Sequence, residues 1–332
     1  MKTRIAINGF GRIGRVLLRT LINHPDVEVV GINDLSPIQT MAHLFKYDSI
    51  HRVFDGAVDF TDDLIHVNGH SIRYYSEQDP KHLPWKQLDV DIVIECTGQF
   101  KSYELAHQHI IAGAKKVILS APPTDDLIKT IVMGVNDDSI KESDTILSNA
   151  SCTTNSAAPM IHLIDKHFGI ESAYITTVHS YTTDQRLHDS PHVDLRRARA
   201  GALSIVPTTT GAAKAITKIF PHLDGKMGGC GIRVPVPDGS LTDITCIVRK
   251  DTSEDEVNRL FEHQASHLFK DIVSYIDIPI VSVDILGNPH SCVFDSLLTS
   301  VIGKMVKVVG WYDNEVGYAN RLLDLILKIR SI

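Results

Sequence analysis

The residue best suited to covalent chemistry is Cys152, in the segment SNASCTTN at residues 148–155. Small polar residues surround it, and a stretch with helical spacing follows over 152–168. This pattern predicts a thiol at a helix N-terminus, where the helix dipole and free backbone N–H groups stabilise a thiolate and bind an oxyanion. A buried structural cysteine is the alternative, but hydroxyl and amide neighbours make a poor apolar core. The other cysteines stand in apolar strand-like segments and are interpreted as structural: Cys96, Cys230, Cys246 and Cys292.

A thiol nucleophile needs a base, and the candidate is His179 in TTVHSYTTDQ, at the end of a predicted strand. A neutral imidazole can take the thiol proton, and the resulting ion pair holds the cysteine as a thiolate. The chain has 17 histidines, so residue type alone does not single this one out. His263 and His267 have the i, i+4 spacing of metal ligands, but they lack the acid of an HExxH motif and stand on a charged helix. We expect a solvated helix face there and no metal.

A glycine motif, GxGxxG at Gly9, Gly11 and Gly14, indicates a dinucleotide site. It follows an apolar run at 3–8 and opens a helical stretch, so its backbone N–H groups can approach a pyrophosphate at a helix N-terminus. Asp34 lies twenty residues beyond Gly14, at the end of the next β-rich run. An acid at this place hydrogen-bonds a ribose 2′-hydroxyl and repels a 2′-phosphate, which favours NAD over NADP. A glycine-rich turn with an unrelated surface acid is the weaker alternative.

Basic and hydroxyl side chains gather between residues 194 and 233. DLRRAR at 194–199 is a basic cluster, VPTTTGAAKA at 206–215 offers hydroxyls and a helix start near Gly211, and Arg233 stands in the strand IRVPVP. Arginines and helix-start N–H groups are what phosphate recognition uses. For Arg196 and Arg199 taken individually, the alternative that they are ordinary exposed charges remains open.

Two patterns of elements must position these residues. Up to about residue 150, strand-like runs alternate with helical stretches such as 103–113, which predicts a mostly parallel, helix-covered sheet. These strand-like runs are 3–8, 27–34, 65–67, 90–98, 115–121 and 130–135.

After about residue 150, short turns join β-rich runs, which predicts an antiparallel sheet. These runs are 173–181, 229–238, 241–250, 279–285, 291–300 and 304–313. A capping box, Ser253 and Glu256, opens a further helix, and an apolar-periodic helix closes the chain at 318–330. We expect an α/β fold: a Rossmann-type sheet domain and an α+β catalytic domain.

Composition sets limits on the class of protein. A length of 332 residues favours two domains, and 43% hydrophobic with 22% charged residues is typical of a globular protein in water. No run approaches the roughly 18 apolar residues of a membrane helix, and no signal peptide is evident, so we expect a cytoplasmic protein without a membrane partner. The net charge of −7 argues against nucleic-acid binding. Five cysteines without a CxxC pair argue against a disulfide framework and a structural zinc site.

The motifs NGFGRIGR, SNASCTTN, HSYT, DLRRARA, PTTTGAAKA, RVPVP and WYDNEVGY, in this order along the chain, resemble phosphorylating glyceraldehyde-3-phosphate dehydrogenase. The resemblance implies NAD-dependent conversion of glyceraldehyde 3-phosphate and inorganic phosphate to 1,3-bisphosphoglycerate through a cysteine thioester, in glycolysis or gluconeogenesis. It also implies a homotetramer. Residues 1–150 would form the NAD-binding domain, with the helix at 315–332 packing back on it, and residues 151–314 the catalytic domain.

By the same resemblance, Cys152 is the nucleophile and His179 the base. Besides the motif glycines, the implied cofactor contacts are Arg12 and Ile13 for the pyrophosphate, Asp34 for the adenosine ribose, and Ser120 and Asn314 for the nicotinamide amide. The implied substrate and phosphate contacts are Ser151, Thr153, Thr182, Thr210, Gly211 and Arg233, with Arg197 as a further anion contact and Asp184 close by.

The chain departs from the family pattern at four places: Ser156 replaces a frequent second cysteine, Val316 a tryptophan, Gln78 an arginine, and Ser190 a leucine. The last change removes apolar bulk near the adenosine ribose, so we expect NAD preference but not exclusivity. Two other functions stay open. Erythrose-4-phosphate dehydrogenase shares the core motifs and uses water as the acceptor. A binding or sensor protein on the same scaffold is disfavoured by the intact Cys152 and His179.

Overall fold

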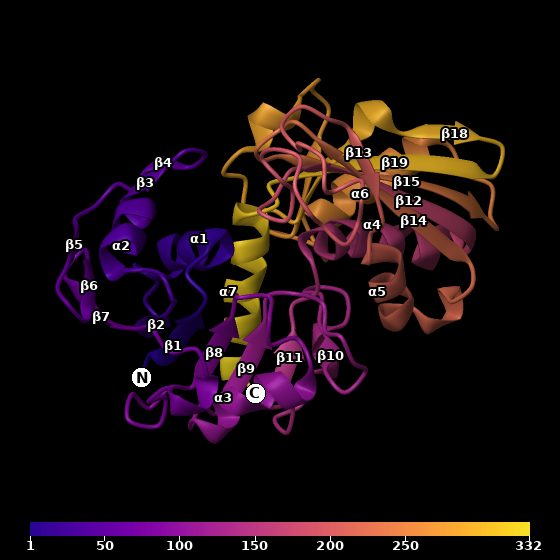
Figure 1. Cartoon of the computed structure of the whole chain (residues 1–332). Coiled ribbons are helices and arrows are strands. Elements are labelled where there is room, and N and C mark those ends of the chain that lie inside the picture. Colours follow the sequence, from indigo (N-terminus) through magenta and orange to yellow (C-terminus); the bar gives the residue numbers. More distant parts are fainter. The chain divides into compact units, whose positions relative to one another are not determined.

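The computed structural model describes all 332 residues (Figure 1). The chain divides into two compact units, which are described separately. Unit 1 contains residues 1–131, 137–150 and 319–332; unit 2 contains residues 132–136 and 151–318. The last helix, α7 (Val316–Arg330), therefore contributes most of its length to unit 1. There Arg330 pairs with Asp26 at 2.5 Å and Lys328 with Asp137 at 2.9 Å.

Unit 1 is built on a nine-stranded sheet in the order β10-β11-β9-β8-β1-β2-β7-β6-β5. All neighbours run parallel except β5 with β6 and β6 with β7, and a separate antiparallel pair, β3–β4, follows α2. The strands are β1 (Thr3–Asn8), β2 (Val27–Asn33), β3 (Tyr47–Asp48), β4 (Arg52–Val53), β5 (Val58–Phe60), β6 (Leu64–Val67), β7 (His70–Tyr75), β8 (Ile92–Glu95), β9 (Lys116–Leu119), β10 (Lys129–Thr130) and β11 (Ile146–Ser148). Its other helices are α1 (Arg12–Leu21), α2 (Ile38–Lys46) and α3 (Tyr103–Ile111).

The strand order of unit 1 reverses at β1. The chain passes from β1 to β2 on one side, and β8 pairs with β1 on the other. Ligands of open α/β sheets bind at the carboxyl ends of strands where the order reverses in this way. The glycine motif directly follows the carboxyl end of β1, so the fold puts it at that edge.

Unit 2 contains an eight-stranded sheet in the order β13-β14-β12-β15-β19-β17-β16, with β18 paired to β19. Most pairs are antiparallel, but β12 with β14 and β16 with β17 are parallel, so the sheet is mixed. Its strands are β12 (Ile170–Ser180), β13 (Val206–Thr208), β14 (Met227–Val234), β15 (Ser240–Val248), β16 (Val273–Ile276), β17 (Cys292–Asp295), β18 (Ser300–Ile302) and β19 (Met305–Tyr312). Its helices are α4 (Cys152–Phe168), α5 (Ala212–Ile219) and α6 (Glu254–Ala265).

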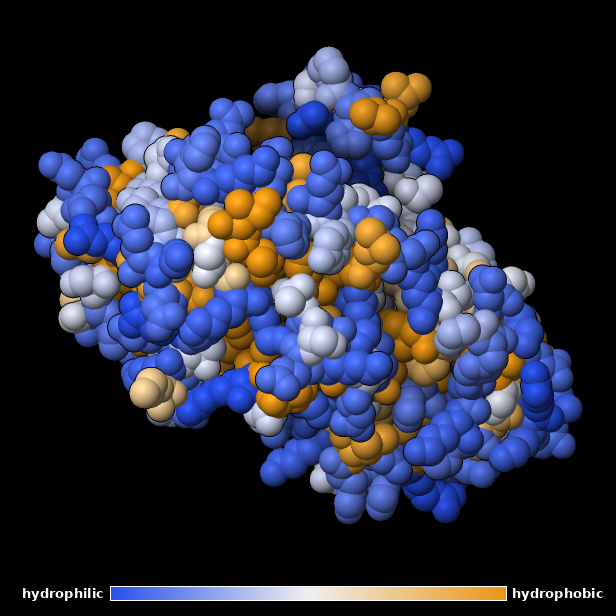
Figure 2. Space-filling view, turned by 90° about the horizontal axis from the view of Figure 1, so that it is seen from below, coloured by the Kyte–Doolittle hydropathy of each residue, from blue (hydrophilic) through white to orange (hydrophobic).

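Short 3₁₀ turns complete the elements: Pro80–His82, Asp137–Ser139, Pro221–Leu223, Ser282–Ile285 and Ser296–Leu298. Each unit has its own apolar core. In unit 2, alternate strand residues such as Ile175, Ile244 and Val308 pack with Met160 of α4 and Phe261 of α6. In unit 1, Val93 and Val117 pack with Ala106 of α3 and with Trp85. On the face shown in Figure 2, hydrophobic residues lie in small clusters between hydrophilic ones. None of the helices has the length and apolar character needed to cross a membrane.

The expected α/β fold class is confirmed, but several expected elements are wrong or missing. Of the run 130–135, only Thr130 lies in a strand, as the last residue of β10. The residues after it leave the sheet in a turn in which the N–H groups of Val135 and Asn136 donate to the carbonyl of Val132. The run 279–285 forms a 3₁₀ turn instead of a strand. In the capping box, the Ser253 hydroxyl accepts from the backbone N–H of Glu256, as expected. Most of the short strands between residues 47 and 75 were not anticipated.

Candidate active site

Cys152 is the first residue of α4. Ser151 caps the helix, since its hydroxyl oxygen accepts the backbone N–H of Thr154 at 3.1 Å. The residue before the cap, Ala150, has φ +56°, a conformation that costs energy for a residue with a Cβ and that turns the chain sharply into the helix. The thiol is therefore presented at the positive end of the helix, as the sequence predicted.

His179 reaches this thiol from the carboxyl end of β12. Its Nε2 lies 3.4 Å from Sγ of Cys152, and the side chain is 4% exposed. The register pairs His179 with Arg233 of the parallel neighbour β14. Arg233 accordingly places Nη1 2.6 Å from Nδ1 of His179 and donates to the carbonyl of Ser180 at 2.9 Å. A thiol, an imidazole and a guanidinium thus form one cluster inside unit 2.

Two neighbours of Nδ1 favour opposite tautomers of the neutral His179 ring. Arg233 can only donate, so its Nη1 at 2.6 Å favours the ring with its hydrogen on Nε2, toward the sulfur. The Ser180 carbonyl, 2.8 Å from Nδ1, can only accept and favours the ring with its hydrogen on Nδ1. Burial, then the charge of Arg233, lowers the pKa of His179 to about 3. Burial raises the pKa of Cys152, although the Arg233 charge opposes the shift. Both shifts disfavour the thiolate–imidazolium pair that we expected from the sequence, and the free site is better described as a thiol beside a neutral imidazole, whose N–H can donate to the sulfur once a thiolate forms.

Tyr312 is a buried member of this cluster that the sequence analysis missed. Its hydroxyl lies 2.9 Å from the hydroxyl oxygens of both Thr153 and Thr177, and its ring meets the His179 ring edge-on at 5.9 Å between centroids. It ties the first turn of α4 to β12 and fixes the plane of the imidazole. Tyr312 stands in the motif WYDNEVGY, but no local pattern indicates this contact, because its partner Thr153 is 159 residues away in the sequence.

Some of the expected anion contacts belong to a second group of side chains in unit 2, which includes Arg197 and Asp184. Arg197 donates from Nε to the hydroxyl of Thr208 at 2.8 Å and forms an ion pair with Asp184. Burial opposes ionisation of Asp184, but hydrogen bonds from Arg197 and His192 hold its pKa below the usual value. The charge of Arg197 reaches both Arg233 and His179, so the two arginines belong to one electropositive site.

Three more of these contacts lie at loop and helix starts. Thr182 donates through its backbone N–H to Oε1 of Gln185 at 2.8 Å, which adds Gln185 to the site. Gly211 caps α5 without a side-chain partner, and a Cβ built there meets nothing within 4 Å. Thr210 accepts the N–H of Ala212 at 3.3 Å. The empty space at the Gly211 Cβ position leaves room for a phosphate at this helix start.

Asn314 follows β19 in the same unit. Its Oδ1 accepts hydroxyl hydrogen bonds from Ser180 at 2.8 Å and Ser240 at 2.7 Å. These bonds orient the amide so that Nδ2 is the end that can donate to a ligand, as expected for a nicotinamide contact.

The glycine motif in unit 1 fits a pyrophosphate. Gly9 has φ +93°, and a Cβ on Gly14 would lie 2.3 Å from the Gly9 carbonyl oxygen, so neither position tolerates a side chain. Gly11 caps α1 without a side-chain bond and has nothing within 4 Å of its Cβ position, which leaves room for a phosphate against the N–H groups of the helix start. Arg12 and Ile13 begin this helix.

The predicted ribose and nicotinamide contacts of unit 1 follow β2 and β9, which have β1 and β8 between them in the sheet. Asp34 comes after β2, and its Oδ2 accepts the backbone N–H of Phe10 at 2.8 Å, so the acid is tied to the glycine loop. Ser120 comes after β9, and its N–H donates to the Glu95 carbonyl at 2.9 Å. Arg12, the expected pyrophosphate contact, is engaged with Asp48 at 2.6 Å. Although burial opposes it, N–H bonds from His51 and Ile50 and the Arg12 pair lower the pKa of Asp48 to about 2.

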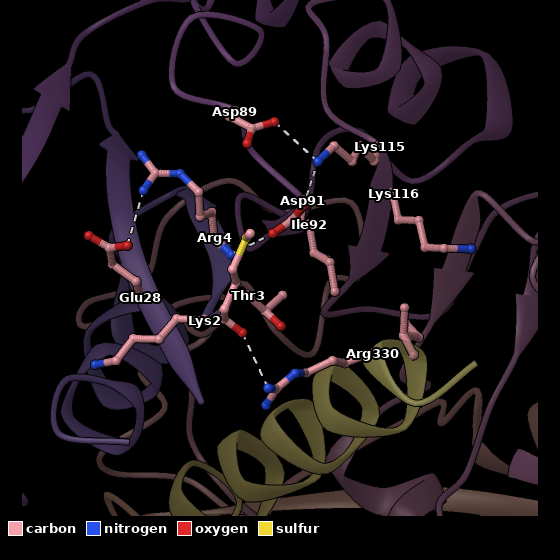
Figure 3. Close-up of a pocket in the computed structure, with 12 residues that line it drawn as sticks. Lys2, Thr3, Arg4, Glu28, Asp89, Asp91, Ile92, Lys115, Lys116 and Arg330 are labelled. Atoms are coloured by element: carbon pink, nitrogen blue, oxygen red, sulfur yellow. Dashed lines mark hydrogen bonds and ion pairs between the residues drawn. The ribbon is translucent and has the colours of Figure 1, made fainter. Parts of the chain in front are cut away.

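A large pocket of unit 1 lies at the other end of the sheet. Its volume is about 630 Å³, and it is lined by the starts of β1, β8 and β9 and by the end of α7. Figure 3 shows ion pairs between several of its charged side chains: Arg4 with Glu28 at 3.0 Å, and Lys115 with Asp89 and Asp91. These pairs hold the strand starts together. Because the pocket is at the amino ends of the parallel strands, it is not the edge at which such sheets bind nucleotides.

Comparison with known proteins identifies the family. Residues 3–103 match the family model of the glyceraldehyde 3-phosphate dehydrogenase NAD-binding domain, and residues 151–314 match that of its C-terminal domain. Curated relatives include glyceraldehyde-3-phosphate dehydrogenase of Thermotoga maritima, 53% identical over 98% of this chain and 99% of the relative. Glyceraldehyde-3-phosphate dehydrogenase 2 of Bacillus subtilis is 50% identical over 100% and 98%. The resemblance seen in the motifs is confirmed, as is NAD as the cofactor. The chain belongs to the glyceraldehyde-3-phosphate dehydrogenase family.

Proposed function

We propose that this chain oxidises glyceraldehyde 3-phosphate with NAD and transfers the acyl group to inorganic phosphate, giving 1,3-bisphosphoglycerate. The observation that carries this proposal is the cluster in unit 2: a thiol at the start of α4, with Nε2 of His179 3.4 Å from its sulfur and Arg233 against the same imidazole. A nucleophile, a base and a cation for a phosphorylated substrate stand together.

In the first step, the Cys152 thiol gives up its proton as its sulfur attacks the aldehyde carbon and forms a C–S bond. The carbonyl electron pair moves onto oxygen, which the N–H groups at the start of α4 and Nε2–H of His179 stabilise. The proton released by the thiol ends on this oxygen and gives a thiohemiacetal on Cys152. The aldehyde is then held covalently before oxidation begins.

In the second step, His179 removes the hydroxyl proton while hydride leaves the same carbon, and a thioester remains on Cys152. NAD, when bound, supplies the hydride acceptor. To accept a proton at Nε2, the neutral imidazole must carry its hydrogen on Nδ1, and the Ser180 carbonyl at 2.8 Å from Nδ1 is the acceptor for that form. An anion that draws Arg233 away from Nδ1 permits this tautomer. A phosphate oxygen then attacks the thioester carbon, the C–S bond breaks, and the thiolate returns.

The phosphate groups of substrate and acceptor have a defined set of partners under this proposal. Arg233 and Arg197 supply charge, and the start of α5 at Gly211 supplies backbone N–H donors. The remaining proposed contacts are hydroxyls at Ser151, Thr153, Thr182 and Thr210. On the cofactor side we propose Gly9, Gly11, Gly14, Arg12, Ile13, Asp34, Ser120 and Asn314.

We also propose that residues 1–150 with 315–332 act as the NAD-binding domain and 151–314 as the catalytic domain. The division of the chain into two units and the ranges of the two family matches support these boundaries.

A homotetramer in the cytoplasm is the assembly and location that we propose. The loop between β12 and β13 supports an assembly, because five of its apolar side chains are at least 69% exposed in the single chain: Leu187, Val193, Leu195, Leu203 and Ile205. Five free cysteines fit a reducing compartment. Sedimentation equilibrium should give four times the chain mass of 36.8 kDa, and Leu195→Asp should lower it. A monomer at micromolar concentration contradicts the proposal.

The function is tested by an assay matrix of aldehyde, cofactor and acceptor. Glyceraldehyde 3-phosphate with NAD should turn over steadily only when inorganic phosphate is present, and one NADH per site should appear in a burst without it. Faster, phosphate-independent turnover with erythrose 4-phosphate would assign the related dehydrogenase instead. A protein that gives no burst with either aldehyde is a sensor and not an enzyme.

A further inference from the structure

Unit 1 buries a carboxylate that the proposed chemistry does not use. Glu95 ends β8 and is 2% exposed. Its Oε1 accepts the backbone N–H of Thr97 at 2.7 Å and also the Thr97 hydroxyl. Its Oε2 accepts Nδ2 of Asn8 at 2.5 Å and lies 3.2 Å from Nε2 of His109. Burying a carboxylate is costly unless donors replace its water, so this full set of partners indicates a selected arrangement.

Trp85 fixes His109 as one of those donors. The indole nitrogen of Trp85 donates to Nδ1 of His109 at 3.1 Å, and both side chains are fully buried. An indole has no acceptor, so Nδ1 must accept, and the neutral imidazole carries its hydrogen on Nε2. That hydrogen points to Glu95. All four groups around the carboxyl are therefore donors, and among side chains of this shape only a carboxylate accepts from all of them.

The buried cluster lies directly behind the edge where the dinucleotide binds. The sheet register aligns Asn8, at the end of β1, with Glu95 on one side and Asn33 on the other. Asn33 donates from Nδ2 to Oδ1 of Asn8 at 2.7 Å. A line of buried polar groups thus crosses the carboxyl ends of β8, β1 and β2.

This line connects the two loops that follow those strands. A Cβ on Gly9 would lie 2.7 Å from the backbone nitrogen of Thr97, so the glycine loop and the loop after β8 are in contact. The N–H of Cys96 also donates to the Asn8 carbonyl at 2.7 Å. Glu95 holds the first loop through Asn8 and the second through Thr97. A change at its carboxyl alters the spacing between them.

We propose that Glu95 is a positioning residue for the cofactor: its carboxylate sets the spacing of the glycine loop and the 96–99 loop, and thereby the affinity for NAD. It acts through Asn8 and Thr97. The proposal concerns NAD binding alone and does not depend on the aldehyde substrate, so it can fail while the proposed function stands.

Glu95→Gln tests the proposal by placing an amide N–H₂ among groups that all donate. Calorimetric titration with NAD should show Kd raised about tenfold or more, since a buried donor is left without an acceptor and the loops shift to relieve it. At saturating NAD, kcat and the KM for glyceraldehyde 3-phosphate should stay within about twofold. An unchanged Kd for NAD overturns the proposal.

Val93→Ala is the matched control for lost stability. Val93 is on the same strand and fully buried in the apolar cluster, but it has no part in the polar line. Its truncation should lower Tm without changing Kd for NAD. If both variants weaken NAD binding in proportion to their loss of Tm, the role of Glu95 is structural and the proposal is wrong.

A second substitution tests the tautomer argument. Trp85→Phe in the Glu95→Gln background removes the indole donor, so His109 can carry its hydrogen on Nδ1 and accept the introduced amide at Nε2. The double variant should bind NAD more tightly than Glu95→Gln alone. If the losses of NAD affinity caused by Glu95→Gln and Trp85→Phe simply add in the double variant, or if the double variant loses more than their sum, the donor arrangement on which the inference rests is wrong.

Discussion

The buried carboxyl groups of Asp238 and Asp313 share a hydrogen bond in unit 2, and each side chain is 1% exposed. Asp313 already accepts the backbone N–H groups of Gly287, Glu315 and Val316 at 2.7–2.9 Å. Asp238 is therefore the member that carries the shared proton. Burial, followed by the charges of Asp313 and Glu315, raises the pKa of Asp238 to about 8.

This pair makes unfolding depend on pH. The folded state keeps a proton on Asp238 that the unfolded chain has lost above its ordinary pKa of 3.8. The stabilisation is complete below that value and is lost as pH rises to about 8, at up to about 1.4 kcal/mol per pH unit. Asp238→Asn, which donates to Asp313 without titrating, should be more stable than the parent at pH 8.

Urea midpoints at pH 5.5, 7 and 8.5, followed by tryptophan fluorescence, measure this difference. Asp255→Asn, a change at an exposed residue, is the control, and its urea midpoint should equal that of the parent at every pH. Parallel curves for the parent and Asp238→Asn would show that the pair does not hold a proton.

Cys152→Ser should retain the fold and NAD binding, because the change is small and lies at a helix start that keeps its Ser151 cap. Oxidation should fall by at least about a hundredfold, since a serine hydroxyl at neutral pH is a poor nucleophile. Stopped-flow NADH formation and calorimetric NAD binding separate the two effects. Residual activity above about one hundredth of the parent would rule out this nucleophile.

His179→Asn should slow hydride transfer by about 10²-fold or more through loss of the base. It should also raise the pH at which iodoacetamide alkylates Cys152, because the Nε2–H donor 3.4 Å from the sulfur is gone. Burst kinetics and the pH profile of labelling measure the two roles separately. An unchanged labelling profile would mean that the imidazole does not support the thiolate.

Asp34→Gly should narrow the preference for NAD over NADP, mainly by improving NADP. Two like charges about 4 Å apart at an effective dielectric near 20 repel by about 4 kcal/mol before screening, so one to two powers of ten in discrimination is reasonable. Ser190 replaces a leucine that the family resemblance puts near the same ribose, so we expect the native preference for NAD to be incomplete. Values of kcat/KM for NAD and NADP, measured in the parent and in Asp34→Gly, test this prediction. A parent protein that prefers NADP would contradict the proposed placement of the Asp34 carboxylate beside the adenosine ribose.

The local parts of the site were predictable from the sequence. A polar run before an apolar-periodic stretch located Cys152 at the start of α4, and the glycine spacing with Asp34 located the nucleotide edge. In both cases the information lies within a few turns of chain, where dipoles, caps and glycine conformations act.

The remaining features depend on long-range register or on burial. Tyr312 meets Thr153 only because β19 and α4 pack together, and the Arg233 contact that suppresses the His179 charge requires the parallel pairing of β12 and β14. The run 279–285 alternates like a strand, yet Val281 and Val283 are 58% and 63% exposed and Val281 donates to Asp284 in a 3₁₀ turn. Hydrophobic pattern alone does not reveal that no sheet face is available to bury them.

All the protein groups that we propose for making and breaking bonds, Cys152, His179 and Arg233, come from unit 2, whereas the glycine loop and Asp34 come from unit 1. Point changes at Asp34 in unit 1 can therefore shift the adenosine preference and leave the thiol chemistry untouched, although we also expect a contribution from Ser190 of unit 2. The same separation guides engineering: cofactor variants at Asp34 and aldehyde variants at Arg197 or Thr210 can be selected in independent libraries and then recombined at the Ala150–Ser151 junction.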